Sequence, residues 1–228
     1  MLEFDIVRSI APFVKYLEDC GFDILPVDNF DRVLDLVPET GRKSQTPIMD
    51  VRRLDFTRSQ AFWLFLVKDG VAVAGIACKI IDLTGENFGS YFQRVAKGQY
   101  DTVESPVRSV AQPILDEVEG KVIYFGELEI HERSRGDRAL LSSFARLAKG
   151  LSAMRWPEFD WMCAIIPDNH FALAKDYGFT WVIPNAFTWR DPVPHRMGDT
   201  HWLMANKRSH YEHEVLVGRL QSSEQKRK

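Results

Sequence analysis

Apolar residues recur along the chain with two periods, one helical and one of two residues, and these periods predict its elements. In order, the first part of the chain predicts a helix at 6–20, a strand at 22–27, a helix at 28–39 and a loop at 41–47. Gly21 is typical of the end of a helix, and Asp28 or Asn29 is expected to cap the amino end of the next helix. The chain is therefore expected to begin with helices and a strand in alternation.

The clearest signal is a pair of apolar runs, AFWLFLV and VAVAGIACKIIDL, joined by Lys68, Asp69 and Gly70. Asp-Gly between runs rich in β-branched and aromatic residues is a strong sign of a β-hairpin, because these two residues accept the positive φ that the turn requires. Antiparallel strands are therefore predicted at residues 61–68 and 71–82.

The rest of the chain predicts further strands and helices, and the signals are mixed only in residues 84–120. Strands are predicted at 121–132, 159–167, 181–190 and 200–208, and helices at 90–98, 107–120, 138–156 and 169–179. We interpret residues 84–120 as an insertion or a substrate lid. A single long helix between two buried strands predicts that 122–130 and 159–166 are parallel, in a mixed sheet. We expect one α/β domain over residues 1–220 and a flexible tail at 221–228.

The strand at 122–130 carries polar residues near its end. Strict alternation assigns one face to Val122, Tyr124, Leu128 and Ile130, and the other to Ile123, Phe125, Glu127, Glu129 and His131. Two carboxylates and an imidazole on one side of one strand suit acid–base chemistry. A strand end that simply meets solvent gives the same pattern, so both interpretations stay open.

The loop after this strand is basic and contains a glycine: its residues include Arg133, Arg135, Gly136 and Arg138. The first turn of the helix that follows supplies free backbone N–H groups and the positive end of the helix dipole. This combination suits a phosphate or a pyrophosphate. The alternative is a solvated loop in which Glu132 and Asp137 neutralise the arginines.

Composition and charge exclude several classes of protein. The chain has 228 residues, 45% of them apolar, and a formal charge of −3, which gives no overall field to attract nucleic acid or an anionic membrane. The charged amino terminus predicts no signal peptide, and no apolar stretch approaches ~18 residues. Cys20, Cys78 and Cys163 lie far apart and are interpreted as buried thiols of a reducing compartment. We therefore expect a cytoplasmic protein without nucleic-acid or membrane partners, and a homodimer is left open.

Other catalytic constellations are weaker. The sequence has no GxSxG motif, and each cysteine lies in an apolar run, so a hydrolase is not expected. The histidines and acids near the carboxyl terminus lack the spacing of a zincin, so no metal site is predicted: His201, His210, His213, Glu212 and Glu214. Most aromatic residues lie in predicted strands and are assigned to the core, and a few are left to line an acyl or acceptor pocket.

Two stretches resemble the GCN5-related N-acetyltransferase (GNAT) family. LEIHERSRGDRALL is similar to the end of that family's fourth strand, its pyrophosphate loop and the following helix. IIPDNHFALAKDYGF is similar to its fifth strand and to the Asn-x-x-Ala helix that ends in Gly-Phe. Together with the hairpin at 61–83, the resemblance implies a mixed, mostly antiparallel central sheet flanked by helices. Its fourth and fifth strands are then parallel and splayed.

The resemblance also implies acyl transfer to a primary amine, with acetyl-CoA as the default donor and its pantetheine arm between the splayed strands. The implied cofactor-binding residues are Leu128, Ile130, Arg133, Arg135, Gly136, Arg138, Ala139 and Asn169. Glu127, with Glu129 as the fallback, takes the proton of the amine, and Tyr177 or His131 protonates the leaving thiolate. The chain departs from the family at Arg138, where the loop usually has Gly or Ala, and at Gly178, which comes early.

Two alternatives remain beside this interpretation. One is an enzyme that transfers a longer acyl chain from CoA or a carrier protein, as in the autoinducer synthases and N-acyl amino acid synthases of this fold. A carrier-protein donor depends less on the pyrophosphate loop. The other is a degenerate domain that binds acyl-CoA or a partner without turnover, and the lack of a clear counterpart for the family's helix tyrosine argues for it.

Overall fold

The computed structural model describes residues 3–53, 56–191 and 200–225 of the chain. Its helices are α1 Glu3–Asp19, α2 Phe30–Glu39, α3 Phe88–Gln99, α4 Gln112–Glu117, α5 Arg138–Arg155 and α6 Arg208–Gln225. Its strands are β1 Asp23–Val27, β2 Ala61–Lys68, β3 Val71–Asp82, β4 Val107–Val110, β5 Lys121–Ile130, β6 Trp161–Pro167, β7 Trp181–Ile183, β8 Phe187–Trp189 and β9 His201–Lys207. The sequence pattern thus predicted most of these elements.

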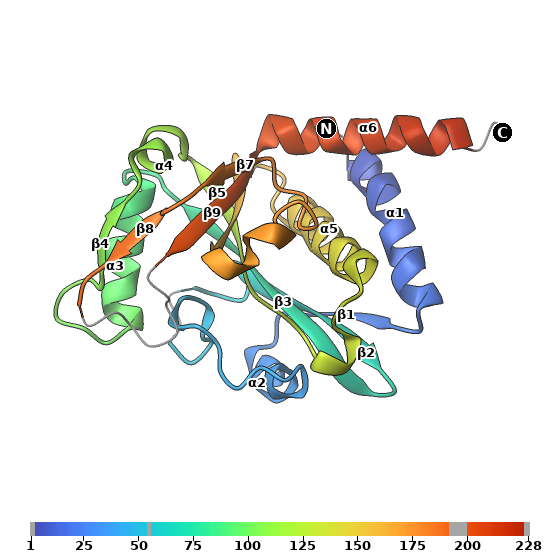
Figure 1. Ribbon diagram of the computed structural model, residues 1–228, viewed down its shortest axis with the longest axis horizontal. Helices are drawn as coiled ribbons and strands as arrows, with labels where there is room; N and C mark the ends of the chain where they lie inside the picture. The colour runs from blue at the N-terminus through green and yellow to red at the C-terminus, as the bar shows by residue number, and fades with distance from the viewer. Residues whose placement is uncertain (1–2, 54–55, 192–199, 226–228) are drawn as a thin grey trace.

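A mixed sheet of seven strands forms the centre of the molecule, in the order β1-β2-β3-β5-β6-β9-β7 (Figure 1). All its neighbouring strands are antiparallel except β5 and β6. A separate sheet of two strands pairs β4 with β8. The predicted fold class, an α/β fold with a mixed, mostly antiparallel central sheet flanked by helices, is confirmed.

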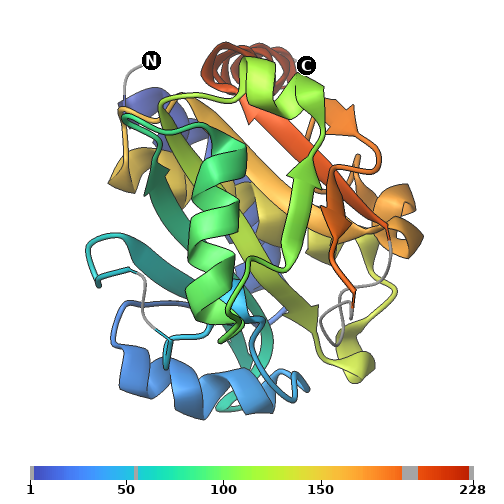
Figure 2. The same ribbon diagram turned by 90° about the vertical axis from the view of Figure 1, so that its left-hand side faces the viewer.

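Helices cover both faces of the central sheet and bury its apolar side chains (Figures 1 and 2). Helices α2 and α3 pack on one face together with the small sheet, and α1, α5 and α6 pack on the other. The β2 run is apolar without interruption because both of its faces are buried: Trp63 and Phe65 contribute to one core, and Phe62 and Leu64 to the other. The hairpin is confirmed, with positive φ at Asp69 and Gly70.

The parallel pair β5 and β6 opens toward its carboxyl ends. Its register runs from Val122 opposite Trp161 to Phe125 opposite Ala164, and no further pair joins the two strands in the described residues. Both strands continue beyond this point, to Ile130 and Pro167. The predicted parallel and splayed strands are therefore present, and the opening between them leads into the candidate site.

The segment 84–120 differs from the prediction in its second half. Its first helix is α3, longer at both ends than expected, and Asn87 and Ser90 form a capping box at its start. The expected helix at 107–120 is wrong: residues 107–110 form β4, and only α4 is helical. The reason is tertiary, since β4 pairs with β8, which lies far away in the sequence. For the same reason the expected strand at 181–190 is divided between β7 and β8.

Two further elements near the carboxyl terminus depart from expectation. The predicted helix at 169–179 is a 3-10 helix, Asp168–Leu173, followed by turns up to Gly178, whose φ is positive. Helix α6 includes residues 221–225 of the segment predicted as a flexible tail, and residues 226–228 lie outside the described part of the chain. None of the described helices is long and apolar enough to cross a membrane.

Candidate active site

A β-bulge in β5 places Glu127 in the site. Gly126 pairs with Ala77 and Glu129 with Gly75, so β5 uses one residue more than β3 over this interval. Glu127 itself has a φ of 59°, a left-handed conformation that costs a residue with a side chain about 1 kcal/mol or more. Strained backbone of this kind is concentrated at functional sites.

The bulge corrects the predicted faces of this strand. Val122 and Tyr124 lie in one core, whereas Leu128 and Ile130 pack on the opposite face with Ile123 and Phe125. Strict alternation placed Leu128 and Ile130 with Val122 and Tyr124, and that assignment is wrong because the extra residue reverses the sides beyond Gly126. The sequence of β5 carries no clear sign of the bulge, although Gly126 stands directly before it.

A cavity of about 1010 Å³ extends from the gap between β5 and β6 into the interior. Its walls come from the loop 42–48, the end of β5, the first half of α5, the end of β6 and the small sheet. Of the predicted site residues, those that line it are Glu127, Leu128, Glu129, Ile130, Arg135, Gly136, Arg138 and Tyr177. Those that are absent from its lining are Arg133, Ala139 and Asn169, and also His131.

Glu127 is buried in the wall of this cavity, and we call the part of the cavity around Glu127 its inner part. Its Oε1 accepts hydrogen bonds from the backbone N–H of Thr46, at 3.0 Å, and from the Thr46 hydroxyl, and its Oε2 lies 3.3 Å from Nε of Arg42. Burial raises the pKa of the Glu127 carboxyl above its usual value, while Arg42 and the Thr46 hydrogen bonds oppose this rise. A carboxylate with a raised pKa in a cavity has the properties of a general base.

Glu129, the fallback base, is engaged differently. Its Oε1 accepts a hydrogen bond from Nη2 of Arg135 at 2.6 Å, and Nε of the same arginine donates to the carbonyl of Ile130. Arg138 lies 3.6 Å from Asp176. Both loop arginines that reach the cavity therefore have acidic partners, as the alternative of a locally neutralised loop predicts, although the pairing acids differ from those expected.

The amino end of α5 is occupied by a side chain of the chain itself. Asp137 is its N-cap, and Oδ1 accepts hydrogen bonds from the N–H groups of Ala139, at 2.8 Å, and Leu140, at 3.0 Å. Its Oδ2 accepts one from the hydroxyl of Tyr16 at 3.0 Å. The N–H group of Leu140 and the Tyr16 hydroxyl lower the pKa of Asp137. Two of the N–H groups expected to bind a pyrophosphate, those of Ala139 and Leu140, are thus already bound to a carboxylate.

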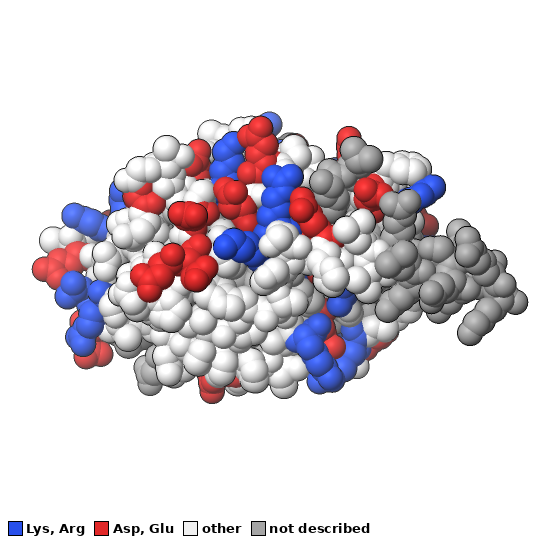
Figure 3. All heavy atoms as spheres, turned by 90° about the horizontal axis from the view of Figure 1, so that it is seen from above, with Lys and Arg blue, Asp and Glu red and all other residues white. Residues whose placement is uncertain are grey.

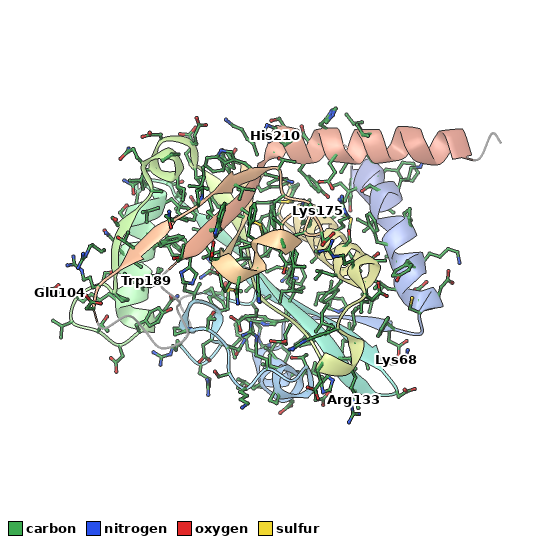
Figure 4. The ribbon with its side chains drawn as sticks, in the orientation of Figure 1. Lys68, Glu104, Arg133, Lys175, Trp189 and His210 are labelled. Atoms are coloured by element: carbon green, nitrogen blue, oxygen red, sulfur yellow. The ribbon has the colours of Figure 1, made fainter. Side chains whose placement is uncertain are left out.

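Arg133 also lies away from the cavity, at the lower edge of the molecule in Figure 4, far from Trp189 at the other end. Its backbone N–H donates to Nδ1 of His131.

Tyr177 lies at the wall near the splayed strands, and burial together with the Asp176 carboxylate raises its pKa to about 12. It therefore keeps its proton at neutral pH, and its hydroxyl can donate a hydrogen bond to a leaving group.

Several cavity residues were not predicted from the sequence. Besides Arg42 and Thr46, the inner part is lined by Phe92 and Tyr100 from the segment 84–120, Phe187 and Trp189 from β8, and His201 from β9. Nε1 of Trp189 donates to Nδ1 of His201, and burial lowers the pKa of this histidine. His201 is therefore neutral at neutral pH with its proton on Nε2. The sequence carries two general signals: the mixed character of residues 84–120, interpreted as an insertion or a substrate lid, and the aromatic residues, of which a few are left to line an acyl or acceptor pocket.

The buried cysteines show no sign of a nucleophilic role. Burial raises the pKa of the Cys78 thiol to about 12, and Cys163 is likewise buried with a raised pKa. Among the described residues no group of histidine, cysteine and acidic side chains has the arrangement of a metal site. On the face seen in Figure 3, acidic and basic side chains are interspersed, which agrees with the near-neutral net charge.

Comparisons with known proteins concern the fold. No protein-family model matches the chain, and no curated protein matches it in sequence. Similar solved structures include Arabidopsis thaliana Naa50 in complex with a bisubstrate analogue (11% identity, 82% of this chain and 99% of that chain, TM-score 0.42). They also include FeeM, an N-acyl amino acid synthase from uncultured soil microbes (10%, 87% and 98%, 0.48), and an agmatine N-acetyltransferase (10%, 81% and 100%, 0.44). These neighbours are GNAT-type proteins, as the resemblance implied.

Proposed function

We propose that the protein is an N-acyltransferase that moves an acyl group from a pantetheine thioester to a primary amine. One observation carries the proposal: the parallel pair β5 and β6 opens onto a deep cavity in which a bulge presents the buried carboxylate of Glu127. A gap between strands suits an extended pantetheine arm, and the buried carboxylate suits an amine.

In the proposed reaction Glu127 removes a proton from the amine, whose nitrogen then attacks the thioester carbonyl carbon. A C–N bond forms, the C–S bond breaks, and the thiolate takes a proton from Tyr177. The raised pKa of Glu127 makes it a stronger base than an exposed glutamate, and Tyr177 keeps its proton until it is needed. Holding amine and thioester in one cavity supplies the remaining acceleration by proximity.

The donor beyond its pantetheine arm is a separate question, because Asp137 occupies the amino end of α5. We include no contact of a CoA pyrophosphate with that helix in the proposal. Acetyl-CoA remains the default donor to test, and a carrier-protein thioester is the second, since it brings a single phosphodiester and depends less on this loop.

A second candidate function is binding of an acyl thioester without turnover. The contacts of Glu127 favour it, since Thr46 holds one carboxylate oxygen and Arg42 lies beside the other. Such a domain would bind the donor without requiring a base. The two candidates differ in one respect that can be measured, the appearance of an acylated amine.

The test is an acyl-transfer assay with acetyl-CoA, longer acyl-CoAs and acyl carrier protein as donors, against a panel of amines, with products identified by mass spectrometry. We expect an N-acylated product with the wild type and about 10²-fold slower formation with Glu127→Gln. Donor binding is followed in parallel by thermal shift, because a ligand that binds only the native state raises its stability. Donor binding without product from any amine would support the second candidate instead.

A further inference from the structure

Four polar atoms in the inner part of the cavity are buried and lack a hydrogen-bond partner among the described residues. They are Nε of Arg42, Oε1 of Gln45, the hydroxyl of Tyr100 and Oε2 of Glu127. Nε of Arg42 and Oε2 of Glu127 lie 3.3 Å apart as an ion pair, so these two atoms have a charged partner but no hydrogen bond. Buried polar atoms without partners are rare in native proteins because each one loses its hydrogen bonds to water. Their concentration on one cavity indicates a ligand that supplies the missing partners.

The protein holds these atoms in place through other contacts. Nε2 of Gln45 donates to the carbonyl of Met49 at 3.1 Å, which leaves Oε1 of this buried amide as the free acceptor. Thr46 binds Oε1 of Glu127, which leaves Oε2. The ring centroids of Tyr100 and Trp189 lie 6.2 Å apart. Burial raises the pKa of the Tyr100 hydroxyl, and the negative charge of the Glu127 carboxylate raises it further.

Three of the four atoms are oxygens that accept hydrogen bonds. A primary ammonium has three N–H donors and no acceptor, so its donors equal the oxygens of Gln45, Tyr100 and Glu127 in number, while the Tyr100 hydroxyl also has a proton to donate. The fourth atom, Nε of Arg42, is a donor and requires an acceptor on the same ligand. Since Arg42 and Glu127 balance each other in charge, a zwitterion leaves the site neutral, with its ammonium at Glu127 and its carboxylate at Arg42.

The remaining walls of this part are aromatic. Phe92, Phe187 and Trp189 line it, and Phe92 and Phe187 lie with ring centroids 5.3 Å apart. Aromatic walls favour an apolar or aromatic body on the ligand. A cavity enclosed in this way suits a small molecule.

We infer that the acceptor is a free α-amino acid with an aromatic or large apolar side chain. Gln45, Tyr100 and Glu127 bind its ammonium, Arg42 binds its carboxylate, and the aromatic wall holds its side chain. The inference rests on the proposed function only where it calls the amino acid the acceptor of an acyl group. Binding of the amino acid requires no donor. In the reaction the bound ammonium loses two protons as it becomes an amide: the first passes to Glu127, which frees the lone pair for attack, and the second passes to solvent water as the amide forms.

The experiment measures binding to the protein alone by calorimetry, without any donor. The probes are phenylalanine, phenethylamine, which lacks the carboxylate, and 3-phenylpropionate, which lacks the amine. We expect phenylalanine to bind about 10-fold or more tightly than either analogue, since each analogue leaves a buried charge without its partner. Phenethylamine binding as tightly as phenylalanine would overturn the assignment of Arg42, and the absence of phenylalanine binding would overturn the inference as a whole.

Variants sharpen this test. Tyr100→Phe removes only a hydroxyl without a partner, so its melting temperature should stay the same or rise, while phenylalanine binds about 10-fold more weakly. Tyr211→Phe, a buried tyrosine outside the cavity lining, is the matched control and should bind as the wild type does. Arg42→Lys keeps the charge beside Glu127 and should reduce the preference for phenylalanine over phenethylamine.

Failure of the inference and failure of the proposed function are distinguishable. Amino-acid binding without acylation by any donor contradicts the proposed function and leaves the inferred site. Acylation of other amines, with Tyr100→Phe binding and reacting as the wild type does, contradicts the inferred site and leaves the proposed function.

Discussion

The two ends of the cavity differ in how fully their polar groups are hydrogen-bonded. At the end formed by the start of α5, hydrogen bonds satisfy most of the charged groups: Asp137 caps the helix and Arg135 binds Glu129. Arg138 lies 3.6 Å from Asp176, whose Oδ2 is buried without a hydrogen bond. At the inner end, polar atoms of Arg42, Gln45, Tyr100 and Glu127 are buried and incompletely paired.

Under the proposed function, this difference leads us to expect ligand recognition mainly at one of the two ends. A ligand at the α5 end must displace contacts that the protein already makes, so it gains little free energy there. A ligand at the inner end supplies hydrogen bonds that are missing, although it must share Glu127 with Thr46 and Arg42. On the proposed function we therefore expect specificity to reside mainly at the inner end, although the family resemblance directs attention to the loop before α5.

The largest expected effect concerns the inner end. Glu127→Gln should lower turnover by about 10²-fold or more, with donor affinity nearly unchanged, because the amide cannot accept the amine's proton. In the wild type the rate should fall as pH decreases through the raised pKa of Glu127, since protonation removes the base. The pH–rate profile of acyl transfer checks this, and equal turnover of both proteins would rule out Glu127 as the base.

The same carboxylate should affect stability in a defined direction. Because its folded-state pKa is raised above 4.5, the native state binds more protons in that range, and the free energy of unfolding falls as pH rises through the raised pKa. Glu127→Gln should remove this fall. Urea denaturation of both proteins at several pH values measures it, and parallel pH profiles would show that Glu127 titrates normally.

A smaller effect is expected from Tyr177→Phe, about 10-fold in turnover, because a poorer route for the proton slows departure of the thiolate. With a pKa of about 12, Tyr177 should cause no decline of the rate up to about pH 11. A donor whose leaving thiol is more acidic needs this proton less and should reduce the difference between variant and wild type. An unchanged rate with every donor would assign Tyr177 to the wall of the cavity only.

At the α5 end the expected effect is of the order of 1 kcal/mol. Asp137→Ala should lower the free energy of unfolding by about 1 kcal/mol, whereas Asp137→Gly should cost only a few tenths. Because the folded-state pKa of Asp137 is lowered, its contribution is present above 3.8 and is lost as pH falls through the lowered value. Tyr16→Phe, which removes only the hydroxyl bound to Asp137, is the control for the contact with α1.

Asp137→Gly also tests whether the Asp137 carboxylate keeps an anionic ligand away from the amino end of α5. If Asp137 competes with an anion, its removal should favour CoA, which carries a pyrophosphate, over pantetheine, which has none. The ratio of CoA affinity to pantetheine affinity should therefore be several-fold higher for Asp137→Gly than for the wild type, and this increase should become smaller as the salt concentration rises. Equal ratios in both proteins would show that the N-cap carboxylate does not affect the donor.

The smallest effect is expected for the exposed pair of Arg135 and Glu129. Arg135→Ala should change the free energy of unfolding by less than about 1 kcal/mol, since ion pairs near solvent gain little over hydration. Denaturant titration at low and high salt measures this. A larger loss that persists at high salt would mean that the hydrogen bond to the Ile130 carbonyl, rather than the charge, holds the loop.

The site was less accessible to sequence reasoning than the fold, for reasons visible in single residues. Glu127 and Tyr177 were predicted because they stand beside motifs with recognisable spacing, although their roles remain proposals. Arg42, Gln45 and Tyr100 could not be predicted, because their neighbours in space come from other parts of the chain. The amino end of α5 shows the reverse: Asp137 was considered as a neutraliser of arginines, but its hydrogen bonds to Ala139 and Leu140 required the helix start to be known.

The sequence by itself determined the hairpin at Asp69 and Gly70, the long helix α5 and the parallel strands on either side of it, because these depend on local turn chemistry and on apolar periodicity. Tertiary structure decided the bulge at Glu127, the pairing of β4 with β8, and the meeting of the loop 42–48 with the end of β5. These depend on contacts between segments distant in the chain, which no local pattern encodes. The β5 bulge reverses the faces of Leu128 and Ile130 by a single extra residue, and the register that produces it is fixed only when β3 lies beside β5.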